Sequence, residues 1–186
     1  MTLHRILLAA CLLAGAIRPA TAQGRYAEIA RLRSMNEGVY GIRSTADGEH
    51  YTTLEGNQVL RYSYAADTPG EKLLPATASE LRIAGYALSP DERRILLWSG
   101  RTPIYRHSFT TSYHLAEGQS VRPVLREAEA PRDATFSPDG RQIAYSDRND
   151  LYLYDIASGR TTRLTDDGVW NAVINGTTDW VYEEEF

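Results

Sequence analysis

The sequence repeats Ala87-Leu-Ser-Pro-Asp-Glu-Arg-Arg-Ile-Leu-Leu-Trp98 as Thr135-Phe-Ser-Pro-Asp-Gly-Arg-Gln-Ile-Ala-Tyr-Ser146, 48 residues further along. A fainter copy, Thr45-Ala-Asp-Gly-Glu-His-Tyr51, lies 44 residues before the middle one. Each copy places a turn at its Asp and follows it with a run of strand-forming residues. Repeats of ~40–50 residues that contain several short strands are typical of β-propeller blades. The repeat therefore predicts an all-β fold built from propeller blades.

The residues around the repeats predict hairpins. Asn57-Gln-Val-Leu-Arg-Tyr62 and Asn149-Asp-Leu-Tyr-Leu-Tyr154 occupy equivalent places after their turns, and both read as strands. Both alternating faces of Leu151–Tyr154 are apolar, as expected of a sheet packed between two neighbouring blades. Glu55–Asn57 and Ala157–Arg160 have the composition of tight hairpin turns.

The chain length limits how much of a propeller is present. Its 186 residues suit one domain. At this period they hold about three four-stranded blades, whereas closed propellers have ~4–8. We therefore expect a partial, incomplete β-propeller, as a fragment of a longer protein would contain.

The first residues have the features of an export signal. Arg5 supplies the positive charge, residues 6–17 are apolar, and Ala20-Thr21-Ala22 forms a small-residue cleavage site. We expect residues 1–22 to be a signal peptide and residues 23–186 the propeller portion, in the periplasm or outside the cell. An alternative is lipid attachment at Cys11, the chain's single cysteine. Just after the signal, Tyr26, Ile29 and Leu32 have the spacing of a short helix.

Composition argues against several functions. The formal net charge is −4 and no basic block is present, so we expect no nucleic-acid partner. The apolar run near the N-terminus is too short to span a bilayer, which takes ~20 residues. His50, His107 and His114 have no ligand-spaced partners, so no metal and no cofactor is expected. The adjacent His107 and Ser108 do not form a catalytic pair by adjacency alone.

Three segments resemble the dipeptidyl peptidase IV branch of the prolyl oligopeptidase-type serine peptidases. The closest is the end of the chain, with Asp179-Trp-Val-Tyr-Glu-Glu-Glu185 at its core. The second is Tyr105-Arg-His-Ser-Phe-Thr-Thr-Ser-Tyr113, which looks like the family's arginine-bearing loop. The third is the Ser-Pro-Asp-Gly repeat, which many unrelated propellers share. The resemblance implies an enzyme with a propeller and an α/β-hydrolase domain that releases X-Pro or X-Ala dipeptides from peptide N-termini.

The resemblance also assigns substrate-binding residues. The second and third glutamates of the run, Glu184 and Glu185, would bind the substrate's free α-ammonium, and Arg106 would contact the carbonyl of its second residue. Taken alone, such a run is usually a solvated face, and Arg106 would be a surface arginine. Neighbouring residues of a strand point to opposite faces, so the two carboxylates can converge only in a helical turn. We therefore expect a short helical turn here, with Glu183 structural or solvated.

Two functional hypotheses follow. In the first, the chain is the N-terminal propeller fragment of a secreted dipeptidyl peptidase IV-like enzyme that recognises substrate N-termini. In the second, it is a non-catalytic propeller module that binds proteins. The family's Gly-x-Ser-x-Gly nucleophile motif does not occur in this sequence. The 186 residues should therefore be inactive as a peptidase by themselves, and no catalytic residue is assigned. The family is often dimeric, so we expect a homodimer only in the full-length form.

Overall fold

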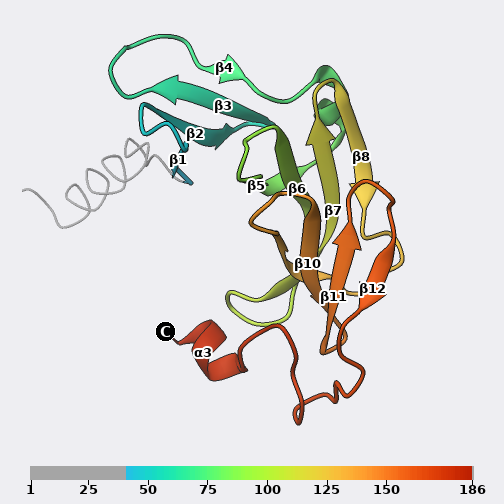
Figure 1. The fold of residues 1–186 in the computed structure, drawn as a ribbon. Helices are drawn as coiled ribbons and strands as arrows, with labels where there is room; N and C mark the ends of the chain where they lie inside the picture. The colour runs from blue at the N-terminus through green and yellow to red at the C-terminus, as the bar shows by residue number, and fades with distance from the viewer. Residues whose placement is uncertain (1–40, 186) are drawn as a thin grey trace, which may run out of the picture. The chain divides into compact units, whose positions relative to one another are not determined.

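The computed structural model describes residues 41–185. The expected signal peptide, the alternative at Cys11 and the short helix at residues 26–32 lie outside the described residues. Within them, every strand belongs to one of three four-stranded antiparallel sheets. Each sheet contains consecutive strands in chain order (Figure 1). This all-β arrangement confirms the partial propeller of about three four-stranded blades.

Each of the three blades contains four strands. Blade 1 contains β1 (Arg43–Ser44), β2 (His50–Glu55), β3 (Gln58–Ser63) and β4 (Glu71–Lys72). Blade 2 contains β5 (Ile83–Leu88), β6 (Arg94–Pro103), β7 (Phe109–Glu117) and β8 (Ser120–Val124). Blade 3 contains β9 (Arg132–Phe136), β10 (Gln142–Asp147), β11 (Asp150–Asp155) and β12 (Thr161–Arg163).

The repeated sequence forms the same turn in each blade. The hydroxyls of Thr45, Ser89 and Ser137 each donate to the aspartate two residues on, at 2.6 Å. That aspartate also accepts a backbone N–H from the residue two positions further along. Short polar side chains that bond locally to the backbone favour a turn over a continued strand. The turn joins the first and second strands of its blade.

The middle blade is packed on both faces. One face of blade 2 contributes Leu96 and Leu115 to a core shared with Ile143, Tyr145 and Tyr154 of blade 3. Its opposite face contributes Ile95, Leu97 and Ala116 to a core shared with Val59 of blade 1. Successive strand residues point to opposite faces, so the neighbours Leu96 and Leu97 enter different cores. Both of these leucines are completely buried.

Among the described residues, β11 joins a hydrophobic core on one face only. In β11, Tyr154 is buried in the core shared with blade 2, and Tyr152 packs against that core. Leu151 and Leu153, on the other face, are partly exposed. The expected two-sided packing is therefore found in blade 2 and not at Leu151–Tyr154.

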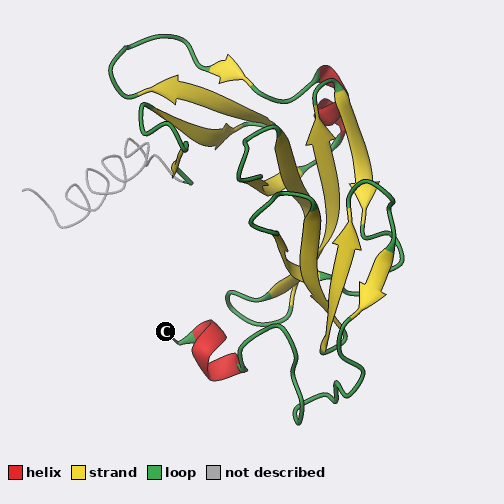
Figure 2. Cartoon of the chain, in the orientation of Figure 1, coloured by secondary structure: helices red, strands yellow, loops and turns green. Residues whose placement is uncertain are grey.

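Two helical segments complete the described chain. The 3-10 helix η1 (Ala76–Glu80) connects blade 1 to blade 2, and no pattern in the sequence predicts it. The α-helix α3 (Trp180–Glu184) follows a long loop after β12 (Figure 2). It confirms that the glutamate run forms a helical turn. Neither described helix is long and apolar enough to cross a membrane.

Candidate functional site

The first part of the site is the loop between β6 and β7. These strands are ten and nine residues long, against six each for β2 and β3. After a register shift beyond Ser99, they pair again at Thr102 with Thr110 and at Pro103 with Phe109. The Arg101 guanidinium lies 3.9 Å from the centroid of the Phe109 ring, a cation–π contact that braces this stem. The hairpin therefore projects the loop 104–108 beyond the blade.

The loop is closed by its own backbone. The Ile104 N–H donates to the carbonyl of Ser108 at 2.9 Å. Arg106 occupies the middle of the loop, and its side chain is 68% exposed. Ser108, by contrast, is buried at the end of the loop, immediately before β7. The loop thus presents an arginine to solvent while its end is fixed inside the protein.

The second part of the site is α3. Asp179 caps its N-terminus by accepting hydrogen bonds from the backbone N–H groups of Val181 and Tyr182, at 2.9 and 3.1 Å. Capping of this kind satisfies donors that have no partner within a helix, so it favours helix initiation at this residue. The five-residue helix then carries Glu183 and Glu184, and Glu185 forms its C-terminal cap.

Glu184 joins the two parts. It is 6% exposed, and its Oε2 accepts the backbone N–H of His107 at 2.8 Å. Its Oε1 accepts both the backbone N–H and the hydroxyl of Ser108, each at 2.9 Å. Burial would raise the pKa of Glu184, but these bonds, with a further contribution from the Arg106 backbone, hold it below its ordinary value. The Glu184 carboxylate is therefore ionised at neutral pH, while it is buried against residues 107 and 108 of the loop.

Glu185 and Arg106 are the accessible charges of the site. The Glu185 side chain is half-exposed, and its Oε1 lies 3.9 Å from a terminal nitrogen of Arg106. Ion pairs this exposed contribute little to stability. Each of the two groups can therefore leave the other and bind a ligand at a small cost in free energy. The structure thus brings all three predicted residues together, with Glu184 buried and the other two open to solvent.

Glu183 has a different partner. Its carboxylate lies 3.5 Å from Arg132 at the start of β9, and the side chain is largely buried. Burial raises the pKa of Glu183, and Arg132 acts against that rise. Arg132 also donates to the Thr177 hydroxyl at 2.6 Å. Glu183 therefore attaches α3 to blade 3, which agrees with the structural role expected of it.

Sequence reasoning missed two residues of this arrangement. Its position beside His107 suggests only a catalytic pair for Ser108, whereas its hydroxyl is bonded to Glu184. Nothing in the sequence singles out Arg132, yet it holds the neighbouring Glu183. No local pattern could have identified either pairing, because 76 residues separate Ser108 from Glu184 and 51 separate Arg132 from Glu183.

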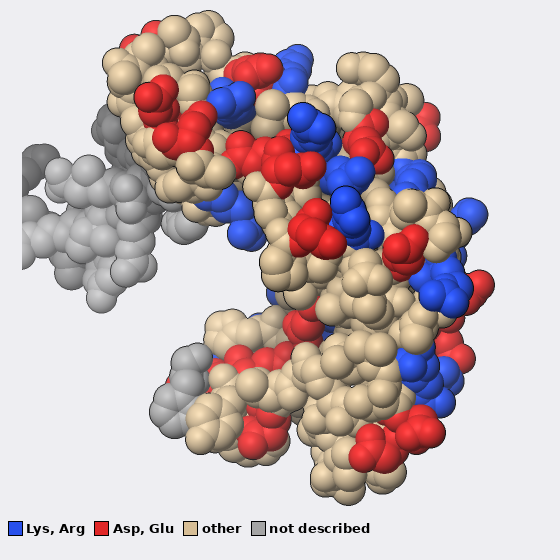
Figure 3. All heavy atoms as spheres, viewed as in Figure 1, with Lys and Arg blue, Asp and Glu red and all other residues tan. Residues whose placement is uncertain are grey.

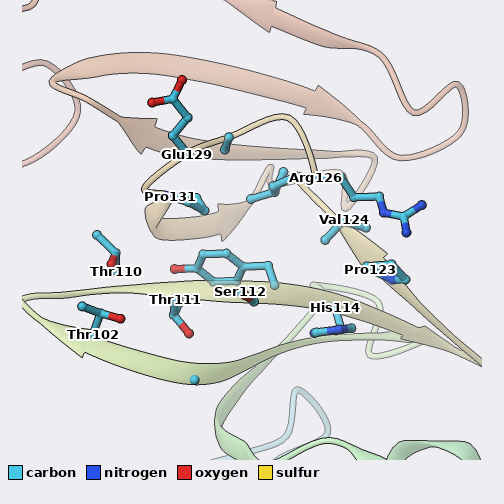
Figure 4. Close-up of a pocket in the computed structure, with 14 residues that line it drawn as sticks. Thr102, Thr110, Thr111, Ser112, His114, Pro123, Val124, Arg126, Glu129 and Pro131 are labelled. Atoms are coloured by element: carbon cyan, nitrogen blue, oxygen red, sulfur yellow. The ribbon is translucent and has the colours of Figure 1, made fainter.

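The surroundings of the site are partly hollow. A cavity of about 700 Å³ lies beside it, lined by loop residues Ile104 and Tyr105 and by Trp180 and Glu183 of α3. A second hollow, of about 460 Å³, lies along β7 and residues 123–131 (Figure 4), and neither α3 nor the loop 104–108 lines it.

Acidic side chains gather at the C-terminal end of the described chain (Figure 3). Among residues 41–185, no group of three or more His, Cys, Asp or Glu is arranged to hold a metal ion.

Comparisons with known proteins identify relatives of this chain. Residues 89–186 match the family model described as the dipeptidyl peptidase IV N-terminal region. Dipeptidyl peptidase 4 of Felis catus is 32% identical over 151 residues, which is 78% of this chain and 20% of that protein. A probable dipeptidyl peptidase 4 of Aspergillus flavus is 31% identical over 168 residues, or 82% of this chain and 21% of that protein.

A solved structure shows the same likeness in three dimensions. The crystal structure of Porphyromonas gingivalis dipeptidyl peptidase 4 superposes with a TM-score of 0.70 at 34% identity. The match covers 78% of this chain and 22% of that one. The chain thus spans about a fifth of the length of the curated relatives it matches. The matched region includes both the loop with Arg106 and the helix with Glu184 and Glu185.

Proposed function

This chain belongs to the dipeptidyl peptidase IV family, and we propose that its Glu184, Glu185 and Arg106 recognise the free N-terminus of a peptide substrate. In the proposal the chain is the N-terminal propeller portion of an exported enzyme. The longer protein would release X-Pro or X-Ala dipeptides, and any homodimer would form through that longer protein. The observation that carries the proposal is the contact of Glu184 with the loop, which assembles the three residues from two distant segments.

The chemistry of an α-ammonium fits the two carboxylates. An ammonium group has three donors and no acceptor, so it needs close anionic acceptors when it leaves water. Glu185 offers an accessible carboxylate, and Glu184 contributes a negative charge held ionised by its bonds to Ser108 and His107. Charge-assisted hydrogen bonds of this kind are about twice as strong as neutral ones. The pair would therefore favour a free N-terminus over a blocked one.

Arg106 would fix the other end of the recognised dipeptide. Its guanidinium has several donors and lies beside Glu185. An arriving ammonium would compete for Glu185 and leave Arg106 free to donate to a substrate carbonyl. An ammonium and a carbonyl bound at fixed separation define the position of the substrate's first two residues. This positioning accounts for the release of dipeptides by a serine supplied elsewhere in the longer protein.

The proposal is tested by the affinity of the chain for Ala-Pro amide and for its N-acetyl derivative, measured by calorimetry. We expect the free amine to bind at least tenfold more tightly than the acetylated compound. Glu185→Gln keeps the shape but removes the charge, so it should abolish most of that difference. Glu80→Gln, at an exposed glutamate on η1, is the matched control and should leave the difference intact.

Two outcomes would overturn this assignment. The first is equal affinity of the wild-type chain for the free and acetylated compounds. The second is a preference for the free amine that Glu185→Gln leaves unchanged. Either result would favour the alternative of a non-catalytic module that binds proteins.

A further inference from the structure

We propose that Ser108 is a positioning residue, which holds Glu184 in the orientation that keeps Glu185 and Arg106 together. This inference rests on the proposed function and goes beyond it, because Ser108 would act without touching the substrate. It concerns the contact between the loop 104–108 of blade 2 and the helix α3, which follows blade 3.

The contact is buried and specific. Ser108 is 5% exposed and Glu184 is 6% exposed, so water is largely excluded from the bonds between them. The Glu184 carboxylate accepts three hydrogen bonds at 2.8–2.9 Å, and Ser108 donates two of them to Oε1, from its N–H and its hydroxyl. A bond in such surroundings is stronger than the same bond in water. The position of Glu184 is thus set mainly by one residue.

The contact also gives Glu184 and Glu185 different roles in the site. A carboxylate has about four acceptor positions, and the loop occupies at least three of those on Glu184. Glu184 therefore gives the site its charge and the loop its anchor, while most of its hydrogen-bonding capacity is already used. Glu185, half-exposed and one residue further along, has its acceptors available to a ligand. Any change in the position of the Glu184 side chain against the loop would move Glu185 relative to Arg106.

The hydroxyl of Ser108 can be removed without removing the backbone donors. In Ser108→Ala the N–H groups of residues 107 and 108 remain, so the loop and α3 should keep their fold. The carboxylate would lose one donor to its charged form, which favours protonation. We therefore expect Ser108→Ala to raise the pKa of Glu184 and to weaken binding of Ala-Pro amide about three- to tenfold.

The experiment compares four proteins by carbon-detected NMR titration of Glu184 and by calorimetry with Ala-Pro amide. They are the wild type, Ser108→Ala, Ser108→Thr, which keeps the hydroxyl, and Ser112→Ala. Ser112, an exposed serine on β7 four residues further along the chain, serves as the matched control. The charged and titratable side chains of the neighbourhood are the same in all four: Glu183, Glu185, Arg106, His107, Arg132 and Asp133. A difference between Ser108→Ala and Ser112→Ala therefore isolates the hydroxyl.

The proposal predicts that Ser108→Ala changes both readouts, that Ser108→Thr restores both, and that Ser112→Ala changes neither. It is overturned if Ser108→Ala matches Ser112→Ala in the pKa of Glu184 and in affinity. Ser108→Cys, which keeps the side-chain size with a weaker donor, gives the same comparison if the alanine variant does not fold. A wild type that binds free and acetylated compounds equally would overturn the proposed function itself, and the ligand-related role of Ser108 with it.

Discussion

At residue 92 the repeated turn departs from its own pattern. The position after the turn aspartate is glycine in blades 1 and 3, where Gly48 and Gly140 have φ of 69° and 68°. Blade 2 has Glu92 there, with φ of 57°. This left-handed conformation costs a residue with a Cβ roughly 1–2 kcal/mol, whereas glycine adopts it freely. The Glu92 carboxylate offsets part of that cost by accepting the backbone N–H of Ala46 in blade 1.

Two substitutions at this position separate strain from hydrogen bonding. Glu92→Ala and Glu92→Gly both lose the bond to Ala46, but only the alanine keeps the strained backbone. We expect the glycine variant to be more stable than the alanine variant by about 1 kcal/mol, in free energy of unfolding by chemical denaturation. An alanine variant as stable as the glycine variant would show that the turn carries no strain.

The sequence predicts individual residues only where their partners are local. The turn aspartates were identified because their bonding partners lie two residues away. The burial of Glu184 could not be predicted, because its donors belong to residues 107 and 108. Acidic runs are ordinarily solvated, so the role proposed for Glu184 rests on the resemblance, and its buried position is seen only in the fold.

Between the elements of blade 2, a glycine on one strand packs against a tryptophan on the next. Gly85 on β5 pairs with Trp98 on β6, and the indole covers the glycine. A Cβ at residue 85 would lie 2.4 Å from atoms of the Trp98 ring, well inside van der Waals contact. Blade 1 contains a similar arrangement, in which the Tyr62 ring covers Gly70. In each case the glycine leaves space for an aromatic ring from the neighbouring strand.

We expect Gly85→Ala to destabilise the chain by roughly 1–3 kcal/mol, the usual range for overpacking. The cause would be the displaced indole, so the cost should fall when Trp98 is replaced by the smaller leucine. A double-mutant cycle of Gly85→Ala and Trp98→Leu, followed by denaturant unfolding, measures this coupling. Strictly additive effects would mean that the ring moves aside without cost.

The elements themselves differ in how far the sequence predicts them. Hairpin turns at Glu55–Asn57 and Ala157–Arg160 were expected from their composition, and both join paired strands in the structure. The helical turn at the glutamate run is confirmed as well. The 3-10 helix at Ala76–Glu80 was missed because five residues with one buried side chain have no readable period. The extension of the β6–β7 hairpin depends on a register shift, which alternation of residue types does not specify.

At the scale of the whole described chain, the middle blade is the one that is packed from both sides. Its neighbours bury Leu96 and Leu97 in two separate cores. The period of the repeat and the length of the chain together predicted about three four-stranded blades. Which faces are covered depends on the presence of a neighbouring blade, so it follows from the arrangement and not from the residues of one strand. The candidate site joins blade 2, through Ser108, to blade 3, through Arg132.

In the proposed function, this part of the chain recognises an α-ammonium. A peptide α-amine has a pKa of roughly 7.7–8.0, so the charged form predominates below that range and disappears above it. The hydrogen bonds to Glu184 hold its pKa below the ordinary value. Its charge therefore does not change over the pH range in which the α-amine titrates. Loss of binding at high pH would therefore report the charge of the ligand.

The direct measurement is the affinity of the wild-type chain for Ala-Pro amide between pH 6 and pH 10, with the N-acetyl compound alongside. The account predicts a constant affinity up to about pH 7 and a fall approaching tenfold per pH unit well above pH 8, as the ammonium deprotonates. The acetylated compound should bind weakly, with no such change. An affinity for the free amine that stays level to pH 10 would contradict the account.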